Sequence, residues 1–329
     1  MAARLKNLVH VEGYFYGVGT GNNALAIKTV KRADSANFGM SFIGGEIQIA
    51  TDEACTNIVR IQYTYEPEYR IDKETGERKE NRNFRDLKKL LDNGNYVLAV
   101  GKENADKVAI NTTLVENAWV SRDNEVVSSA QLEGGFITLN PILSEDEAER
   151  ARFEVDMFLA DGAVKHVEHE DSEETLKLHG GVFNFRNDIN IIDLVGTGNM
   201  IDFFEDLIAD GPVFACVTGV LDFANIEATI EEEGAFGPIV RKISRRKRDF
   251  VIKNVKDYDR PLEDGVPFNG EDIKKALQDR EVRLADVKKN YEDYQANKAA
   301  GAFSGTATTS PVASMTPAQT SIPKEKFKF

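Results

Sequence analysis

Cysteine and histidine are scarce in this 329-residue sequence, and its apolar runs are short. The two cysteines, Cys55 and Cys216, stand far apart and form no CxxC pair, which excludes a disulfide framework and is typical of reduced thiols in a cytosolic protein. Apolar runs such as YVLAV at 96–100 fall far short of the roughly 20 residues that span a bilayer. The first residues, MAARLKNLVHVEG, lack the long apolar region of a signal peptide. We therefore expect a cytoplasmic protein with no membrane partner.

Motifs that bind cofactors or perform catalysis are also missing. The glycine-rich turns at 16–22 and 195–200 lack the GxGxxG spacing before a helix, and the chain has no GK[ST]. With four histidines and no nucleophile elbow, no Ser/His/Asp or Cys/His arrangement stands out. The sequence thus predicts a protein that is not an enzyme and that holds no cofactor or metal.

Strand signals dominate up to about residue 260. Partial alternation of apolar and polar residues recurs, for example at 8–19 and 57–69, with glycine pairs and Asn/Asp clusters between the segments. Glycine also recurs inside apolar runs, in HVEGYFYG (10–17), LEGGFITL (132–139), LHGGVFNF (178–185) and VTGVLDF (217–223). Interior glycines mark the bulges and bends that curl small sheets into barrels. We predict a mainly β protein with two OB-like β-barrel domains; a pair of β-sandwiches fits nearly as well.

The composition of the chain changes at three places, which divide it into four parts. An acidic segment with capping-box spacing follows Pro141 and predicts a boundary between a first β-rich domain, 1–140, and a second, 150–262. A C-terminal helix is expected at 268–300. The Ser/Thr/Ala/Pro-rich tail, 301–329, is too polar to build a core, and we expect it to be disordered and to recruit a partner.

The predicted C-terminal helix carries a narrow apolar stripe. Leu277, Leu284 and Tyr291 repeat every seven residues; Val287 and Tyr294 fill the intermediate seam, which Arg280 interrupts. Such a stripe suits packing on a domain or pairing with a second helix, so self-association is one use for it.

Positive charge is concentrated in one segment of a chain whose formal net charge is −14. Six of the eight residues from 241 to 248 are basic: Arg241, Lys242, Arg245, Arg246, Lys247 and Arg248. They follow the acidic stretch EATIEEE at 227–233, and the two segments read as the strands of a hairpin. A basic ribbon suits a phosphate backbone, which any nucleic-acid sequence presents. Neutralisation of the facing acidic strand is an equally good interpretation.

Aromatic residues with cations nearby form a second candidate site. Tyr63 and Tyr65 share a face in a predicted strand, and Arg60, Arg82 and Arg85 are close in sequence. Single-stranded nucleic acid is held in this way, with bases stacked on aromatic rings and phosphates paired with cations. Packing of the tyrosines in the core is the alternative.

The C-terminal half resembles a known group of proteins. Residues 180–196 (GGVFNFRNDINIIDLVG), 199–209 (NMIDFFEDLIA), 239–252 (IVRKISRRKRDFVI) and 277–295 (LQDREVRLADVKKNYEDYQ) are similar in order to tailed-bacteriophage single-stranded DNA-binding replication proteins. The resemblance implies tandem OB-like domains that bind single-stranded DNA without sequence preference during DNA replication or recombination, with replication proteins as partners of the tail. No individual site residue follows from it. The basic C-terminus KEKFKF departs from the acidic tip of bacterial single-strand binders, which puts recruitment of the same partners in doubt.

Two other functions remain open. One is a phage structural or assembly protein whose basic arm grips the acidic surface of a neighbour. The weaker one is a metal-dependent nuclease, suggested by a group of carboxylates: Asp188, Asp193, Asp202, Glu205 and Asp206.

Overall fold

A computed structural model describes residues 5–31, 33, 35, 37–72, 74–169, 172–234, 237–261 and 269–299. The protein is mainly β, as predicted. The predicted tail, 301–329, lies outside the described residues. None of the helices in the described part is long and apolar enough to cross a membrane.

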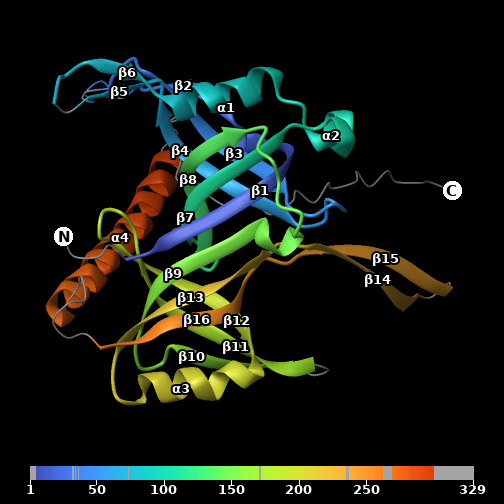
Figure 1. The fold of residues 1–329 in the computed structure, drawn as a ribbon, viewed down its shortest axis with the longest axis vertical. Helices are drawn as coiled ribbons and strands as arrows, with labels where there is room; N and C mark the ends of the chain where they lie inside the picture. The colour runs from blue at the N-terminus through green and yellow to red at the C-terminus, as the bar shows by residue number, and fades with distance from the viewer. Residues whose placement is uncertain are drawn as a thin grey trace. The chain divides into compact units, whose positions relative to one another are not determined.

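The first half of the chain forms a closed ring of strands (Figure 1). The elements of this half of the chain are β1 (Asn7–Val18), η1 (Gly21–Asn23), β2 (Ala26–Thr29), β3 (Ser41–Ala50), β4 (Ile58–Pro67), β5 (Tyr69–Ile71), β6 (Arg78–Glu80), α1 (Arg82–Asn93), α2 (Val97–Val100), η2 (Lys102–Asn104), β7 (Lys107–Val120) and β8 (Val126–Leu139). Pairing runs β1-β7-β8-β4-β3 and returns to β1, with β4 and β8 parallel. We call this ring barrel 1.

The second half repeats the arrangement. Its elements are η3 (Glu147–Glu149), β9 (Ala151–Leu159), β10 (Val164–His169), β11 (Ser172–Phe183), β12 (Ile189–Thr197), η4 (Gly198–Met200), α3 (Ile201–Ala209), β13 (Val213–Asp222), β14 (Asn225–Gly234), β15 (Gly237–Arg246), β16 (Asp249–Pro261) and α4 (Gly270–Ala299). Pairing runs β9-β13-β16-β12-β11 and returns to β9, with β12 and β16 parallel. We call this ring barrel 2.

Both rings therefore have the same construction. Each has five strands, its third and fifth strands are parallel, and a helix stands between the third and the fourth. This is the topology of the OB-fold, a Greek-key barrel. The predicted fold class is confirmed, since rings that close on themselves are barrels and not sandwiches.

The first strands of the two barrels pair with each other. β1 and β9 are antiparallel, with Val9 opposite Phe153 and Val11 opposite Ala151. Because equivalent strands meet in this way, the pairing joins the barrels into one twelve-stranded sheet. The predicted boundary near 140–150 falls at the segment before β9, and the division into two domains stays a prediction.

Two of the interior glycines identified in the sequence allow close approaches within the barrels. A Cβ at Gly13 would lie 2.0 Å from the carbonyl oxygen of Ala50, and one at Gly219 would lie 2.0 Å from that of Val251. The strand register also shifts between Thr218 and Gly219. A side chain at either position would push the paired strands apart, which explains glycine inside these apolar runs.

By contacts the chain forms two compact units. The first comprises residues up to Asn117 and Ser129–Glu281, and so holds both barrels and the start of α4. The second comprises Ala118–Ser128 and the part of α4 from Val282 onward.

Candidate nucleic-acid interface

The basic segment lies in a hairpin inserted into barrel 2. β14 and β15 form a separate two-stranded ribbon between β13 and β16, which are the fourth and fifth strands of the barrel (Figure 1). We call this ribbon the arm. In OB-folds, the loop between the fourth and fifth strands is one of the elements that bind oligonucleotides. The topology therefore places the basic segment at a position where OB-folds bind oligonucleotides.

Backbone register in the arm bears on the neutralisation hypothesis. Basic positions lie opposite neutral ones: Arg241 opposite Ile230, Lys242 opposite Thr229, Arg245 opposite Ile226 and Arg246 opposite Asn225. The acidic positions Glu231 and Glu232 lie opposite Val240 and Ile239. The register thus does not pair these four cations with the acidic run directly across the hairpin. The side chains of 225–246 lie outside the described residues.

Lys247 and Arg248, at the base of the arm, are in different surroundings. The Lys247 ammonium lies 2.7 Å from a carboxylate oxygen of Asp222 and 3.5 Å from one of Asp249. These contacts, that with Asp222 first, raise the pKa of Lys247. Lys247 is therefore engaged with the protein's own carboxylates and anchors the arm, whereas Arg248 is exposed.

Asn57 of barrel 1 holds the other side of the base of the arm. Its side-chain oxygen accepts a hydrogen bond of 2.8 Å from the backbone N–H of Phe223, and its amide donates to the carbonyl of Leu221 at 3.0 Å. A bridge between Asn57 and Ala224 completes the contact. The arm consequently leaves barrel 2 at a point fixed by barrel 1.

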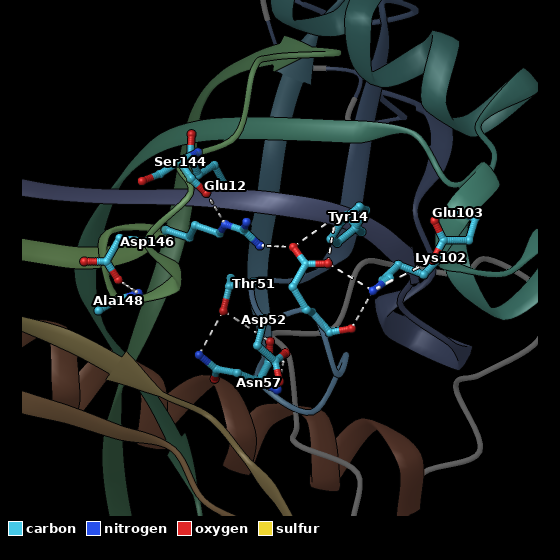
Figure 2. A network of polar contacts seen from close by, with 12 residues as sticks. Glu12, Tyr14, Thr51, Asp52, Asn57, Lys102, Glu103, Ser144, Asp146 and Ala148 are labelled. Carbon is cyan, nitrogen blue, oxygen red and sulfur yellow. Dashed lines mark hydrogen bonds and ion pairs between the residues drawn. The ribbon is translucent and has the colours of Figure 1, made fainter.

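The loop that ends at Asn57 is itself held by a polar network (Figure 2). The Glu53 carboxylate accepts hydrogen bonds from Arg150 at 2.7 Å, from Lys102 at 3.0 Å and from the Tyr14 hydroxyl at 3.1 Å. These donors, Arg150 first, lower the pKa of Glu53 to about 2. Because Arg150 directly precedes β9, the network ties the segment between the barrels to barrel 1.

The two tyrosines predicted to stack on bases lie in different environments. Tyr63 is only 1 % exposed, and its hydroxyl donates to the carbonyl of Gly135 at 3.3 Å. Burial raises the pKa of this phenol. Such a ring offers no face to a base, so the stacking prediction for Tyr63 does not fit, and packing in the core does. Tyr65, near the end of β4, is 38 % exposed and packs against Phe42 with ring centroids 4.9 Å apart.

The cations predicted to accompany the tyrosines occupy two elements. Arg60 on β4 lies 3.7 Å from the carboxylate of Glu46. Arg82 and Arg85, on α1, share the buried carboxylate of Asp86 at 3.4 and 3.3 Å. Three cations of α1 converge on Asp86, since Lys89 also lies 3.5 Å from it. Lys88 pairs with Asp92, the other acid of the helix, so four basic residues of α1 stand against two carboxylates.

Phe136 is an exposed aromatic that sequence reasoning did not single out. It lies on β8 of barrel 1, is 66 % exposed and has the guanidinium of Arg70 over its ring, 5.9 Å from the centroid. The available signal was the pair of glycines before it in LEGGFITL, which marks a bend where an apolar residue can turn outward.

Two of the five acidic residues behind the nuclease hypothesis pair with histidines of the protein. Asp193 accepts from His179 at 2.7 Å and contacts Lys177 at 2.8 Å; although burial raises its pKa, these bonds lower it to about 2. Glu205 contacts His166 at 3.0 Å. Among the described residues, no three His, Cys, Asp or Glu side chains are grouped so that they could hold a metal ion.

The fold and the inserted arm define a class: a protein of two OB barrels joined through their first strands, with a basic ribbon between the last two strands of the second. A model of the YorF family matches residues 22–290, and the chain belongs to this family. No curated protein matches the chain. A solved structure of a deletion variant of the single-stranded DNA-binding protein from Thermus aquaticus is similar at 14 % identity and a TM-score of 0.42, covering 80 % of this chain and 98 % of that one.

Proposed function

We propose that this protein binds single-stranded DNA without sequence preference and acts in phage DNA replication or recombination, in the cytoplasm of the infected host. One observation carries the proposal: the basic segment 241–248 occupies the insertion between the fourth and fifth strands of an OB barrel. That position is where OB-folds contact oligonucleotides. The concentrated positive charge of the chain therefore lies at a position that binds nucleic acid in other OB-folds.

Binding in this proposal is mainly electrostatic. The cations of the arm contact phosphates and release counterions, so affinity falls as salt rises. The remainder of the chain is strongly acidic and repels nucleic acid, which confines the strand to the arm and nearby cations. Tyr65 supplies stacking from barrel 1. We further propose that the tail contacts replication proteins and that the apolar stripe of α4 supports self-association.

The test is a titration of fluorescent oligo-dT with the protein and a charge-reversed variant of the arm. Arg245→Glu with Arg246→Glu should weaken binding at least tenfold and reduce the dependence of log K on log salt, because phosphate contacts are lost. Lys288→Glu with Lys289→Glu is the matched control, since both lysines are exposed on α4 and the change in net charge is the same.

The outcomes separate the candidate functions. Equal loss in both variants would mean that net charge alone matters and would remove the arm from the account. A wild-type protein that ignores the oligonucleotide would contradict the proposal and favour a structural or assembly role. Shortening of the oligonucleotide on addition of magnesium or manganese would favour a nuclease.

A further inference from the structure

An aromatic ring on barrel 1 faces solvent although it lies beside the core. Phe136 is flanked on β8 by Ile137, which is buried, and by Gly135. Its ring is largely exposed. A single exposed apolar ring is common on protein surfaces, so its significance depends on what holds it and on what lies beside it.

The backbone around Phe136 is fixed by buried groups. The amide of Asn83 donates to the carbonyl of Gly135 at 2.8 Å, and its side-chain oxygen accepts from the N–H of Ile137 at 3.1 Å. Asn83 is buried, and Tyr63 adds a second hydrogen bond to the same carbonyl of Gly135. The peptide units on both sides of Phe136 are therefore clamped, which fixes the direction in which its side chain leaves the strand.

A cation is held against the ring by a further chain of contacts. Asn81, the cap of α1, donates to Glu66 at 2.9 Å, and Glu66 pairs with Arg70 at 3.3 Å. Arg70 in turn lies over Phe136. The start of α1 thus positions both the exposed ring, through Asn83, and its cation, through Asn81.

The same helix start brings a surplus of positive charge. Residues 78–92 contain six basic and three acidic residues, and two of the cations are paired, Lys79 with Asp72 and Lys88 with Asp92. Arg82, Arg85 and Lys89 all reach the one carboxylate of Asp86 and remain more than two-fifths exposed. An exposed aromatic ring beside clustered cations has the composition of a site for single-stranded nucleic acid.

We propose that Phe136, Arg70 and the cations of α1 form a second contact for single-stranded nucleic acid, on barrel 1 and separate from the arm. A base stacks on Phe136, and Arg82, Arg85 and Lys89 take the neighbouring phosphates. This inference rests on the proposed function, because it assumes that the ligand is a single strand and not a protein.

The experiment measures binding of oligo-dT by four variants. Phe136→Ala should weaken affinity roughly 5- to 150-fold with the salt slope unchanged, because a stacked base and no phosphate contact is lost. Phe136→Tyr should keep most of the affinity, since it retains an aromatic face, whereas Phe136→Leu should lose as much as Phe136→Ala. A site that needs only an apolar side chain would instead tolerate leucine.

Phe185→Ala is the matched control. Phe185 is 67 % exposed and has Arg186 over its ring at 5.1 Å, but it stands in the turn between β11 and β12. Its loss should leave affinity within about twofold of the wild type. Equal weakening by Phe185→Ala and Phe136→Ala would overturn the assignment of a specific stacking site.

Photocrosslinking gives a readout independent of affinity. With an oligonucleotide that contains 5-iododeoxyuridine, the crosslink should map to the tryptic peptide 123–150, in which Phe136 is the only aromatic residue. Crosslinks confined to other peptides would overturn the inference. If the wild type binds the oligonucleotide, and the arm variant loses binding but Phe136→Ala does not, the second contact is contradicted and the proposed function is supported. A wild type that binds no single strand contradicts both.

Discussion

The guanidinium of Arg280 on α4 grips the carboxylate of Glu116 on β7 through two hydrogen bonds. Its Nε donates at 2.7 Å to one oxygen, and Nη2 donates to the other. The Glu116 side chain is only 4 % exposed. Two turns earlier, Ile273 packs in a small core with Phe183 and Phe214 of barrel 2. The start of α4 therefore fastens to both barrels.

Loss of Arg280 should be costly for stability. Arg280→Ala removes both guanidinium hydrogen bonds from the buried Glu116 carboxylate, and we expect the free energy of unfolding to fall by about 3–5 kcal/mol. Urea denaturation measures this. Lys274→Ala, at an exposed position of the same helix, should change it by less than about 0.5 kcal/mol. Similar effects of the two substitutions would show that the ion pair contributes little.

Glu53 should make the free energy of unfolding depend on pH in the acidic range. Its pKa is lowered from an ordinary 4.5 to about 2 in the folded protein. A lowered folded pKa stabilises the protein above the unfolded value, and this contribution disappears as pH falls from about 4.5 towards 2. The wild type should exceed Glu53→Gln in unfolding free energy at pH 7, by an amount that solvent screening keeps modest because the side chain is nearly half exposed. Denaturant titrations at pH 7, 4 and 3 should show the gap closing; a constant gap would contradict the assignment.

Asn57 should control the base of the arm. Asn57→Ala removes the acceptor of the Phe223 N–H, so this amide should lose protection against hydrogen exchange, and stability should fall by about 1–3 kcal/mol. Asn57→Asp keeps the oxygen and should preserve much of the protection. If protection of Phe223 is the same in all three proteins, Asn57 does not hold the arm.

The bend before Phe136 should tolerate no side chain at Gly135. This residue has φ +110°, and a Cβ there would lie 2.3 Å from the carbonyl oxygen of Asn111. We expect Gly135→Ala to cost about 2–4 kcal/mol, measured by urea denaturation. Gly134 has φ +65° with open space around it, so Gly134→Ala should cost only about 1 kcal/mol. Equal costs would show that the close approach is relieved elsewhere.

Local patterns predicted the architecture but not the individual contacts. Alternation of apolar and polar residues and glycines inside apolar runs predicted β-barrels, because both patterns reflect contacts within a strand or between neighbouring strands. Tyr63 and Tyr65 fall on the same face of one strand by alternation, yet only Tyr63 is buried, a difference that alternation cannot predict. In the sequence Arg280 looks like an interruption of an apolar stripe, because its partner, Glu116, lies 164 residues away.

The candidate site was predicted in part for the same reason. The basic run at 241–248 is visible in the sequence, but its place between the fourth and fifth strands depends on the ring closure of barrel 2. Lys247 could not be told from its neighbours, since its pairing with Asp222 follows from how β13 and β16 meet. The role of Phe136 could not be predicted, because its backbone is held by the buried Asn83, which is distant in sequence.

The most direct test is the affinity of the wild-type protein for a fluorescent dT oligonucleotide and for a duplex of equal length, each measured by anisotropy over a series of salt concentrations. The account predicts tight binding of the single strand that weakens linearly in log salt, and markedly weaker binding of the duplex, whose bases are not free to stack. Absence of single-strand binding at low salt, or equal affinity for the duplex, would contradict it.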